Sequence, residues 1–474
     1  MREVEIQPIP LDRLARLLSP ERVRRLEDNA VLARALMADR TMWNINATSK
    51  GGGVAEMLQA LLAYGRGAGV DTRWLVLDGD HDFFQITKRL HNFLHGSTGD
   101  GGELGHRERE HYKRVLAFNL PMAEQVVDRG DIVLLHDPQT AGLVEGLRAD
   151  GAHVVWRCHI GRDTPDALAA IGWEFLREFI AEADGFIFSR REYVPDWVPR
   201  EKVVIIAPSI DPFSAKNIDL TPAQIRGSLA HAGLVNGQPQ LDGDLAFIRR
   251  DGSRGEVRRH QGLVHGHGAI PHEARLVVQV SRWDRLKDMP GVLQGFTDRL
   301  DVLPPDTHLA LVGPETSGVS DDPEGAAVLD ECVSRWERLP AEAQERVHLV
   351  SLPMDDVDEN AHLVNALQRH ASVVVQKSIV EGFGLTVTEA MWKARPVIAS
   401  AIGGIQDQIQ DGVHGLLLDD PHDLAAYGDA LERVLQDQEF ADKLGQAARE
   451  RVMDQYLGDR HLIQYVGLFA SLIS

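Results

Sequence analysis

With 474 residues the chain is too long for a single hydrophobic core, so we expect at least two domains. Its formal net charge of −21 argues against a nucleic acid partner, because such a protein needs a basic face to neutralise phosphates. The charge-rich N-terminal region and the lack of any apolar run of about eighteen residues predict neither a signal peptide nor a membrane span, and hence a cytoplasmic protein.

Short apolar runs rich in β-branched residues alternate with longer amphipathic stretches along nearly the whole chain. The strands predicted in the first half are 41–47, 72–78, 131–137, 153–160, 185–189 and 202–209. Those predicted in the second half are 275–281, 308–313, 347–353, 372–376, 396–400 and 415–419. Continuous Val, Ile and Leu runs are typical of strands covered on both faces, and their alternation with helices indicates parallel sheets. The sequence therefore predicts an α/β protein with two doubly wound, Rossmann-like sheets.

A polar, glycine-rich segment, residues 227–260, separates the two series and is interpreted as a connection or a peripheral insertion. We place the first domain at residues 1–212 and the second at residues 213–455. The apolar segment at the end of the chain predicts a helix at about 456–474 that packs back on the first domain. Because open α/β sheets bind ligands beyond the carboxyl ends of their strands, we expect the site in a cleft between two facing halves.

The turn after the first strand, "TSKGGGVAEM" (48–57), is the first candidate. Gly52 and Gly53 would let the backbone approach a ligand, and the helix that follows would offer N–H groups to an anion. It is not a dinucleotide fingerprint, since Glu56 stands where that motif needs a small residue. A tight structural turn and a phosphate or sugar contact both stay open.

A basic turn, "VSRWDRLKDM" (280–289), follows the first strand of the second half. Arg282 offers a planar fork and Lys287 a mobile charge, which together suit a diphosphate. The alternative is a solvated turn in which Asp284 and Asp288 pair with the two cations. His159 similarly ends an apolar run, where it is either a core residue or a group that hydrogen-bonds a sugar at the reaction centre.

Asp78 and Asp80 form a D-x-D directly after a predicted strand. Such a pair can hold a divalent cation that in turn holds a nucleotide diphosphate. We favour a polar turn with its glycine in the left-handed conformation, because Arg282 and Lys287 would neutralise a diphosphate without metal. No metal or other cofactor is therefore expected.

The stretch "VEGFGLTVTEAMW" (380–392) places a carboxylate on each side of a glycine turn that opens a helix. Gly384, Leu385 and Thr386 would form the first helical turn and donate backbone N–H groups to phosphate. Glu381 would point beyond the phosphate, and Glu389 would accept hydrogen bonds from a vicinal diol such as ribose. One turn could thus bind sugar, diphosphate and ribose in sequence.

"EGFGLTVTE" resembles the E-x7-E motif of retaining GT-B glycosyltransferases of the glycogen-synthase and sucrose-synthase type. "GGGVAE" and "SRWDRLK" match the other donor-site motifs of that type in order and position. The segments "WNINATSKGGGVAEM", "HDPQT", "WRCHI", "DDPEG" (321–325) and "VNALQ" are, more narrowly, similar to glucosyl-transferring trehalose synthases, and the resemblance covers roughly residues 35–470.

The resemblance implies a GT-B fold and a metal-free transfer of glucose from ADP-, UDP- or GDP-glucose to free glucose, which gives α,α-trehalose with retention. It implies that Arg282 and Lys287 hold the departing diphosphate, that Glu381 lies at the glucose 3-hydroxyl with an electrostatic rather than covalent role, and that Glu389 holds ribose. His159 would lie by the glucose hydroxymethyl group. Gly52 and Gly53 would line the phosphate and acceptor. The family pattern has Asp after "CHI", where this chain has Gly161.

Rival interpretations come from other classes. A trehalose phosphorylase would use the same fold and basic pair with inorganic phosphate. Another nucleotide-sugar-dependent retaining glycosyltransferase is a further alternative. A nucleotide-sugar epimerase and a non-catalytic sugar- or nucleotide-binding module each explain fewer of the turns together. The sequence leaves open the nucleotide base, the physiological direction and assembly into a homodimer.

Overall fold

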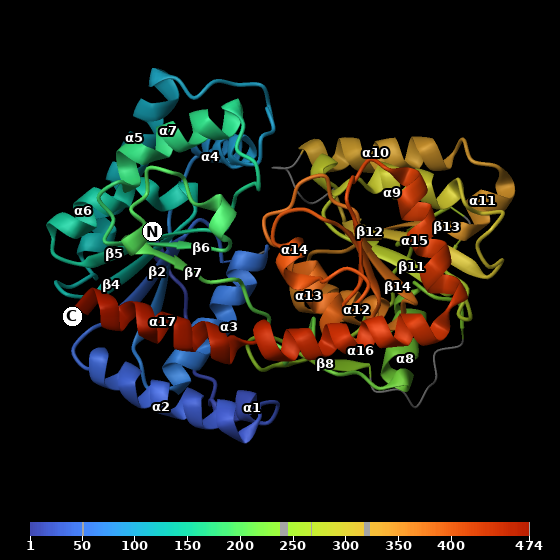
Figure 1. Ribbon diagram of the computed structural model, residues 1–474, viewed down its shortest axis with the longest axis horizontal. Helices are drawn as coiled ribbons and strands as arrows, with labels where there is room; N and C mark the ends of the chain where they lie inside the picture. The colour runs from blue at the N-terminus through green and yellow to red at the C-terminus, as the bar shows by residue number, and fades with distance from the viewer. Residues whose placement is uncertain (50–51, 238–244, 267, 317–322, 474) are drawn as a thin grey trace. The chain divides into compact units, whose positions relative to one another are not determined.

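The computed structural model describes residues 1–49, 52–237, 245–266, 268–316 and 323–473 (Figure 1). The chain divides into two compact units: the first unit contains Met1–Ser209 and Tyr456–Ser474, and the second unit contains Ile210–Gln455. Gly51 of the glycine turn and the first two residues of 321–325 lie outside the described residues. Within the described ranges, no helix has the length and apolarity that a membrane crossing requires.

The first unit contains all six strands predicted for the first half. They are β2 (Met42–Asn46), β3 (Thr72–Val76), β4 (Ile132–His136), β5 (His153–Cys158), β6 (Gly185–Phe188) and β7 (Val203–Ile205). A short strand that the sequence did not reveal, β1 (Arg2–Glu3), joins the edge. The order is β1-β3-β2-β4-β5-β6-β7, and only the β1–β3 pair is antiparallel.

Helices cover both faces of the first sheet. They are α1 (Asp12–Ala15), α2 (Pro20–Leu36), α3 (Gly53–Gly67), α4 (His81–Leu94), α5 (His106–Glu124), α6 (Val144–Ala149), α7 (Ala167–Ile180) and α17 (Gly458–Ile473), with the 3-10 turns η1 (Pro138–Leu143), η2 (Arg191–Tyr193) and η3 (Arg200–Lys202). Strand β4 shows why: Ile132 and Leu134 join the core under α2, α3 and α17, whereas Val133 and Leu135 join the core under α4, α5 and α7. A strand buried on both faces must be apolar at every position, as the predicted run is.

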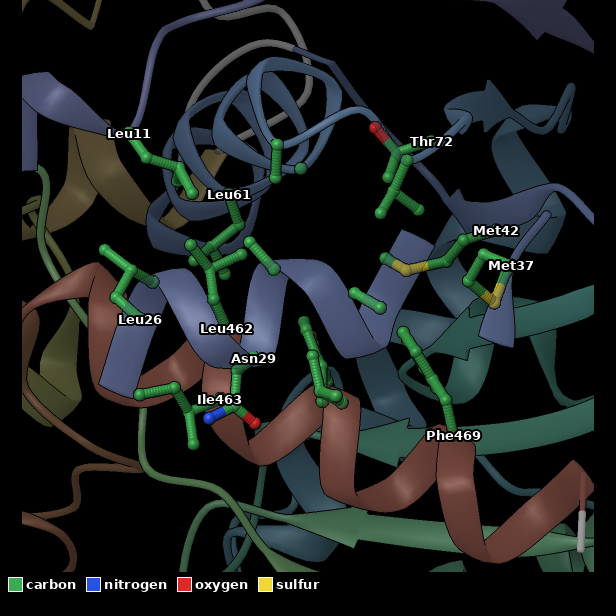
Figure 2. Close-up of a pocket in the computed structure, with 17 residues that line it drawn as sticks. Leu11, Leu26, Asn29, Met37, Met42, Leu61, Thr72, Leu462, Ile463 and Phe469 are labelled. Carbon is green, nitrogen blue, oxygen red and sulfur yellow. The ribbon is translucent and has the colours of Figure 1, made fainter. Parts of the chain in front are cut away.

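The C-terminal helix α17 packs against α2 and α3 in the first unit. A cavity of about 50 Å³ lies among these helices, and apolar side chains line nearly all of it (Figure 2). Figure 2 shows Leu26 and Asn29 of α2, Leu61 of α3, and Leu462 and Phe469 of α17 around it. The cavity is a packing defect in the core rather than a site with polar groups for a sugar.

The second unit also contains every predicted strand. These are β11 (Arg275–Val280), β12 (Thr307–Pro314), β13 (Val347–Leu352), β14 (Val373–Gln376), β15 (Val397–Ser400) and β16 (Leu416–Leu418), with β10 (Val264–His265) added antiparallel at one edge. The order is β10-β13-β12-β11-β14-β15-β16. The helices are α8 (Pro222–Ala232), α9 (Met289–Thr297), α10 (Pro323–Trp336), α11 (Ala341–Arg346), α12 (Val357–His370), α13 (Leu385–Trp392), α14 (Ile405–Gln408), α15 (Leu424–Gln436) and α16 (Gln438–Gln455), with the 3-10 turn η4 (Arg285–Lys287).

The interpretation of residues 227–260 as an irregular connection was incomplete. The segment begins inside α8 and contains a hairpin of β8 (Ala246–Ile248) and β9 (Arg254–Glu256). The strands are short, and arginine–carboxylate pairs with the loop before α12 and its first turn hold the hairpin, for example Arg249 with Asp356 at 2.7 Å. Ion pairs between residues far apart in sequence leave no hydrophobic periodicity, which is why the pattern missed the hairpin.

The strand orders locate the point at which each sheet can bind a ligand. In the second unit the chain builds outward from β11 through β12 and β13, and then crosses to β14 on the other side of β11. In the first unit β3 lies on one side of β2 and β4 on the other. A crevice opens beyond the carboxyl ends of two neighbouring strands whose connections run in opposite directions. The turns after β11 and β14, and those after β2 and β4, are therefore the positions to inspect.

Candidate functional site

In the second unit the turns after β11 and β14 bring a lysine and a glutamate together. Lys287 Nζ donates to Glu381 Oε2 at 2.6 Å, and the two side chains are only 16% and 12% exposed. Ser378 Oγ donates to the same carboxylate oxygen at 3.3 Å. The Ile379 N–H donates to the Leu286 carbonyl at 2.7 Å, which fastens one turn to the other. Two residues predicted as site residues thus form one ion pair at the switch point.

Arg282 lies in the same turn as Lys287, but its side chain is more exposed. It pairs with Asp284 at 3.0 Å and is 53% exposed. Asp284 also accepts from the Leu286 N–H at 2.9 Å, so it begins the 3-10 turn that carries Lys287. Of the two aspartates considered as partners of the basic pair, Asp284 does pair with Arg282. Asp288 pairs instead with the buried Lys377, a cation that the sequence analysis did not single out.

The helix α13 begins at the glycine turn, as predicted for a phosphate-binding position. Gly384 is its N-cap residue, with φ of 84° in the left-handed region, and a Cβ there would lie 3.0 Å from Ile405 and 3.3 Å from Glu381. The N–H groups of Leu385 and Thr386 have no acceptor within the helix, because the first helical hydrogen bond runs from the Val387 N–H to the Gly384 carbonyl. These N–H groups are suited to an anion.

Glu389 lies in α13 with its carboxylate buried beside a lysine. Its Oε1 is 3.3 Å from Lys216 Nζ, and its side chain is 3% exposed. Lys393, also buried, donates to the Glu389 carbonyl at 3.0 Å and to Asn217 Oδ1 at 3.1 Å. Burial lowers the pKa of Lys393 to about 7, and the Glu389 carboxylate opposes this shift. Lys216 was missed because it lies in a polar stretch far away in the sequence, with no motif around it.

In the first unit the predicted His159 follows β5 and is held by Asp137, which follows β4. The His159 N–H lies 2.8 Å from Asp137 Oδ1, and its Nδ1 lies 3.0 Å from Asp137 Oδ2. The ring stacks on that of His136, with centroids 5.5 Å apart. His159 Nε2 is buried and makes no hydrogen bond within the described part of the chain. Asp137 was not predicted, although its position after a strand could have indicated it.

The surroundings of His159 shift its pKa in opposite directions. Burial is the largest cause that lowers its pKa, the guanidinium of Arg157 lowers it further, and the Asp137 carboxylate raises it. With Nδ1 facing a carboxylate, the ring proton belongs on Nδ1 and leaves Nε2 as a hydrogen-bond acceptor. His159 therefore presents an oriented acceptor at the carboxyl edge of the first sheet.

The remaining predicted residues of the first unit occupy turns. Gly52 is the N-cap of α3, with φ of 80°, and Gly53 is the first residue of that helix. Nothing lies within 4 Å of a Cβ added to Gly52, so only its backbone conformation favours glycine. At Gly161 an added Cβ would lie 2.2 Å from the Tyr193 ring, which explains why this chain has glycine after "CHI".

The D-x-D serves the fold of the first unit. Asp80 caps α4 by accepting from the Phe83 N–H at 2.8 Å, and a hydrogen bond from His111 is the largest cause that lowers its pKa. Asp78 accepts from the Met1 nitrogen at 2.6 Å. The expected left-handed glycine between them was wrong, since Gly79 has no positive φ. No group of three metal-ligating side chains occurs among the described residues.

Comparisons with known protein families cover most of the chain. Residues 44–195 match the family model for the trehalose synthase N-terminal domain, and residues 264–451 match that for glycosyl transferases group 1. The trehalose synthase of Thermococcus litoralis is 35% identical over 439 residues, which cover 92% of this chain and 91% of that protein.

More distant relatives and a solved structure extend the comparison. A trehalose phosphorylase of Pleurotus pulmonarius is 28% identical over 437 residues, which cover 86% of this chain but only 54% of that protein. A structure described as trehalose-6-phosphate from E. coli bound with UDP-2-fluoro glucose superposes with a TM-score of 0.67 at 14% identity, over 92% of this chain and 99% of that one. This last likeness shows the fold, and the two α/β units are those of a GT-B glycosyltransferase.

Proposed function

Because the chain belongs to the trehalose synthase family of glycosyltransferases, we propose that it transfers glucose from a nucleoside-diphosphate glucose to free glucose, with retention of the anomeric configuration. The product is α,α-trehalose. The observation that carries the proposal is the Lys287–Glu381 ion pair at the N-terminus of α13, where a cation, a carboxylate and N–H groups with no acceptor in their own helix occupy one switch point.

The donor's charge suits these groups. Its diphosphate would take the N–H groups of Leu385 and Thr386 and the ammonium of Lys287, with Arg282 as a second cation. Lys287 would then exchange part of its bond with Glu381 for the phosphate. A pair that is already assembled at the switch point needs little reorganisation when negative charge develops on the leaving group.

The reaction breaks the bond between the glucose anomeric carbon and the phosphate oxygen, and the electron pair leaves with the diphosphate. The acceptor hydroxyl attacks from the same face, and its proton passes to the departing phosphate oxygen. The Glu381 carboxylate, 2.6 Å from Lys287 Nζ, would stabilise the positive charge that develops on the sugar, without bonding to it. His159 Nε2 would accept a hydrogen bond from a hydroxyl of the bound glucose.

Glu389 would accept hydrogen bonds from the two ribose hydroxyl groups of the nucleotide. Its carboxylate is ion-paired with Lys216, so binding of a diol would require it to share that contact. Catalysis is proposed to be independent of metal, because the cations of the turn after β11 and the N-terminus of α13 would neutralise the diphosphate, while Asp78 and Asp80 hold parts of the first unit. Loss of transfer in EDTA, restored by Mg²⁺ or Mn²⁺, would contradict this.

The test is direct assay. The purified protein is incubated with glucose and with ADP-, UDP- or GDP-glucose in separate tubes, and trehalose and the free nucleoside diphosphate are quantified. Equal amounts of the two products, with an α,α linkage by NMR, are expected in at least one tube. Trehalose breakdown with inorganic phosphate and without nucleotide would favour a phosphorylase, the activity of the more distant relatives. No product in any tube would overturn the proposal.

A further inference from the structure

Arg157, in β5, is a charged side chain whose contacts in the described part of the chain are all with neutral groups. It is 0% exposed. Its Nη1 donates to His461 Nε2 at 2.8 Å and to the Tyr465 hydroxyl, and its Nη2 lies 3.4 Å from the Ile206 carbonyl. Within the described ranges no carboxylate lies at ion-pair distance from it. Burying a charge without an opposite charge beside it destabilises the folded protein, so a buried arginine of this kind suggests a role.

The C-terminal helix α17 supplies the neutral acceptors. His461 Nε2 can accept from a guanidinium only if it carries no proton, so the ring proton lies on Nδ1, which is 2.9 Å from Ser209 Oγ. A protonated His461 would aim an N–H at an N–H. The geometry alone therefore requires a neutral imidazole next to Arg157, and burial followed by the Arg157 charge lowers the pKa of His461 well below its usual value.

His159 lies two residues after Arg157, and unlike His461 it has a carboxylate beside it. The Asp137 carboxylate, 3.0 Å from its Nδ1, would by itself favour the imidazolium form. The other titratable or charged groups around it are His136 from β4, stacked on its ring, Arg157 from β5, and His461 from α17. Arg157 is the permanent positive charge in this set, and it opposes protonation of every histidine near it.

We propose that Arg157 is a positioning residue that, together with burial, favours the neutral imidazole of His159, with its proton on Nδ1 against Asp137 and Nε2 as an acceptor for a sugar hydroxyl. The inference rests on the proposed function only for the identity of the sugar. The α17 helix has a part in this role, because His461 Nε2 accepts from the guanidinium at 2.8 Å.

The charge state of His159 matters for a reaction that develops positive charge on glucose. A neutral Nε2 orients a hydroxyl by accepting from it. A protonated ring would instead add a second positive charge beside the reacting sugar and raise the barrier. Loss of Arg157 should therefore lower activity at the acid end of the pH range and leave activity at high pH in place.

The experiment replaces Arg157 by Met, which has similar length and no charge, and by Lys, which keeps the charge. His159 is followed by NMR in histidine-labelled protein, with His159→Gln used to assign its signal, and kcat/KM is measured against pH. In Arg157→Met the apparent pKa of His159 and the acid limb of kcat/KM should both shift to higher pH. In Arg157→Lys both should stay near those of the unchanged protein.

Tyr465→Phe is the matched structural control, because it removes one hydrogen bond to Arg157 and keeps the charge, so it should leave the His159 titration in place. A folded Arg157→Met variant with an unchanged His159 titration would overturn the proposal. If that variant does not fold, the unchanged protein decides: titration of His159 at or above its ordinary value of about 6.5 would contradict the role of Arg157. The titration needs no substrate, so its result does not depend on whether the proposed transfer reaction is observed.

Discussion

Both units carry their candidate site residues at the carboxyl ends of parallel strands, but the charged groups there are paired differently. In the second unit each predicted glutamate already has a lysine partner, Lys287 for Glu381 and Lys216 for Glu389. In the first unit Arg157 is buried and has no carboxylate at ion-pair distance among the described residues, and His159 Nε2 is buried without a hydrogen bond in that same part of the chain.

The difference follows from what each unit would bind. A diphosphate brings two or more negative charges, and a cation that a glutamate already neutralises can be shared with it at little electrostatic cost. A sugar brings only hydroxyl groups, which need oriented acceptors rather than charge. We therefore expect activity to be sensitive to loss of charged side chains in the second unit, and to loss of side-chain orientation in the first.

The largest expected effect is at the Lys287–Glu381 pair. Lys287→Met should lower kcat by about 10²- to 10³-fold, because it removes a preorganised cation from the leaving group, and Glu381→Ala should lower kcat by ~10²-fold or more. Steady-state kinetics on variants checked by thermal melting provide the measurement. Arg285→Met, in the same 3-10 turn and exposed, is the matched control and should change kcat by less than about twofold. Equal effects at positions 285 and 287 would remove Lys287 from the site.

Glu389 should give a different kinetic signature. If it grips ribose equally in the ground and transition states, Glu389→Gln should raise the donor KM by roughly 10-fold and change kcat only modestly. The exposed Glu439→Gln in α16 serves as the control. A fall in kcat with an unchanged donor KM would assign Glu389 to the chemistry, and no kinetic change at all would leave it a structural partner of Lys216.

Acid should weaken the second unit through a buried histidine. Burial lowers the pKa of His362 to about 4, while Ser228 Oγ lies 2.9 Å from its Nε2. Since the folded pKa lies below the unfolded value of about 6.5, the unfolded chain binds the proton first. The stability contribution is fully present above about pH 6.5 and is lost as the pH falls towards 4, on the order of 3 kcal/mol.

Thermal melts between pH 4.5 and 7.5 check this prediction. His362→Gln, which keeps a partner for Ser228 but cannot titrate, should show a shallower decline in melting temperature with acid. Other buried histidines, among them His136 and His461 in the first unit, will leave part of the decline in place. An identical pH dependence in the variant and the unchanged protein would show that His362 does not contribute.

The smallest expected effect concerns the apolar cavity of the first unit. Ala33, on α2, lines it and is buried. Ala33→Val should fill part of the roughly 50 Å³ and stabilise the protein by about 0.5–1 kcal/mol, with no change in kinetics. A lower melting temperature would mean that the three helices cannot accommodate the added methyl groups.

Much of the fold could be read from the sequence, because buried parallel strands leave a pattern that local reasoning detects. All twelve predicted strands are present, and turns such as 282–287 and 381–386 lie where a doubly wound sheet puts its ligand. The E-x7-E stretch likewise predicted the start of α13 to within a residue, since a glycine with positive φ ahead of an apolar helix is a local feature.

The partners of the site residues could not be read in this way. Lys216 and Glu389, Asp137 and His159, and Arg157 and His461 each come from different elements, and nothing in their spacing marks them as pairs. The sequence alone determined where the strands of the two parallel sheets form and predicted which turns bear the candidate site residues, because periodicity and turn residues act over a few positions. Only the tertiary structure decided which charge is paired, which nitrogen is left unused and which arginine is buried, because these depend on contacts between segments up to the length of the whole chain apart.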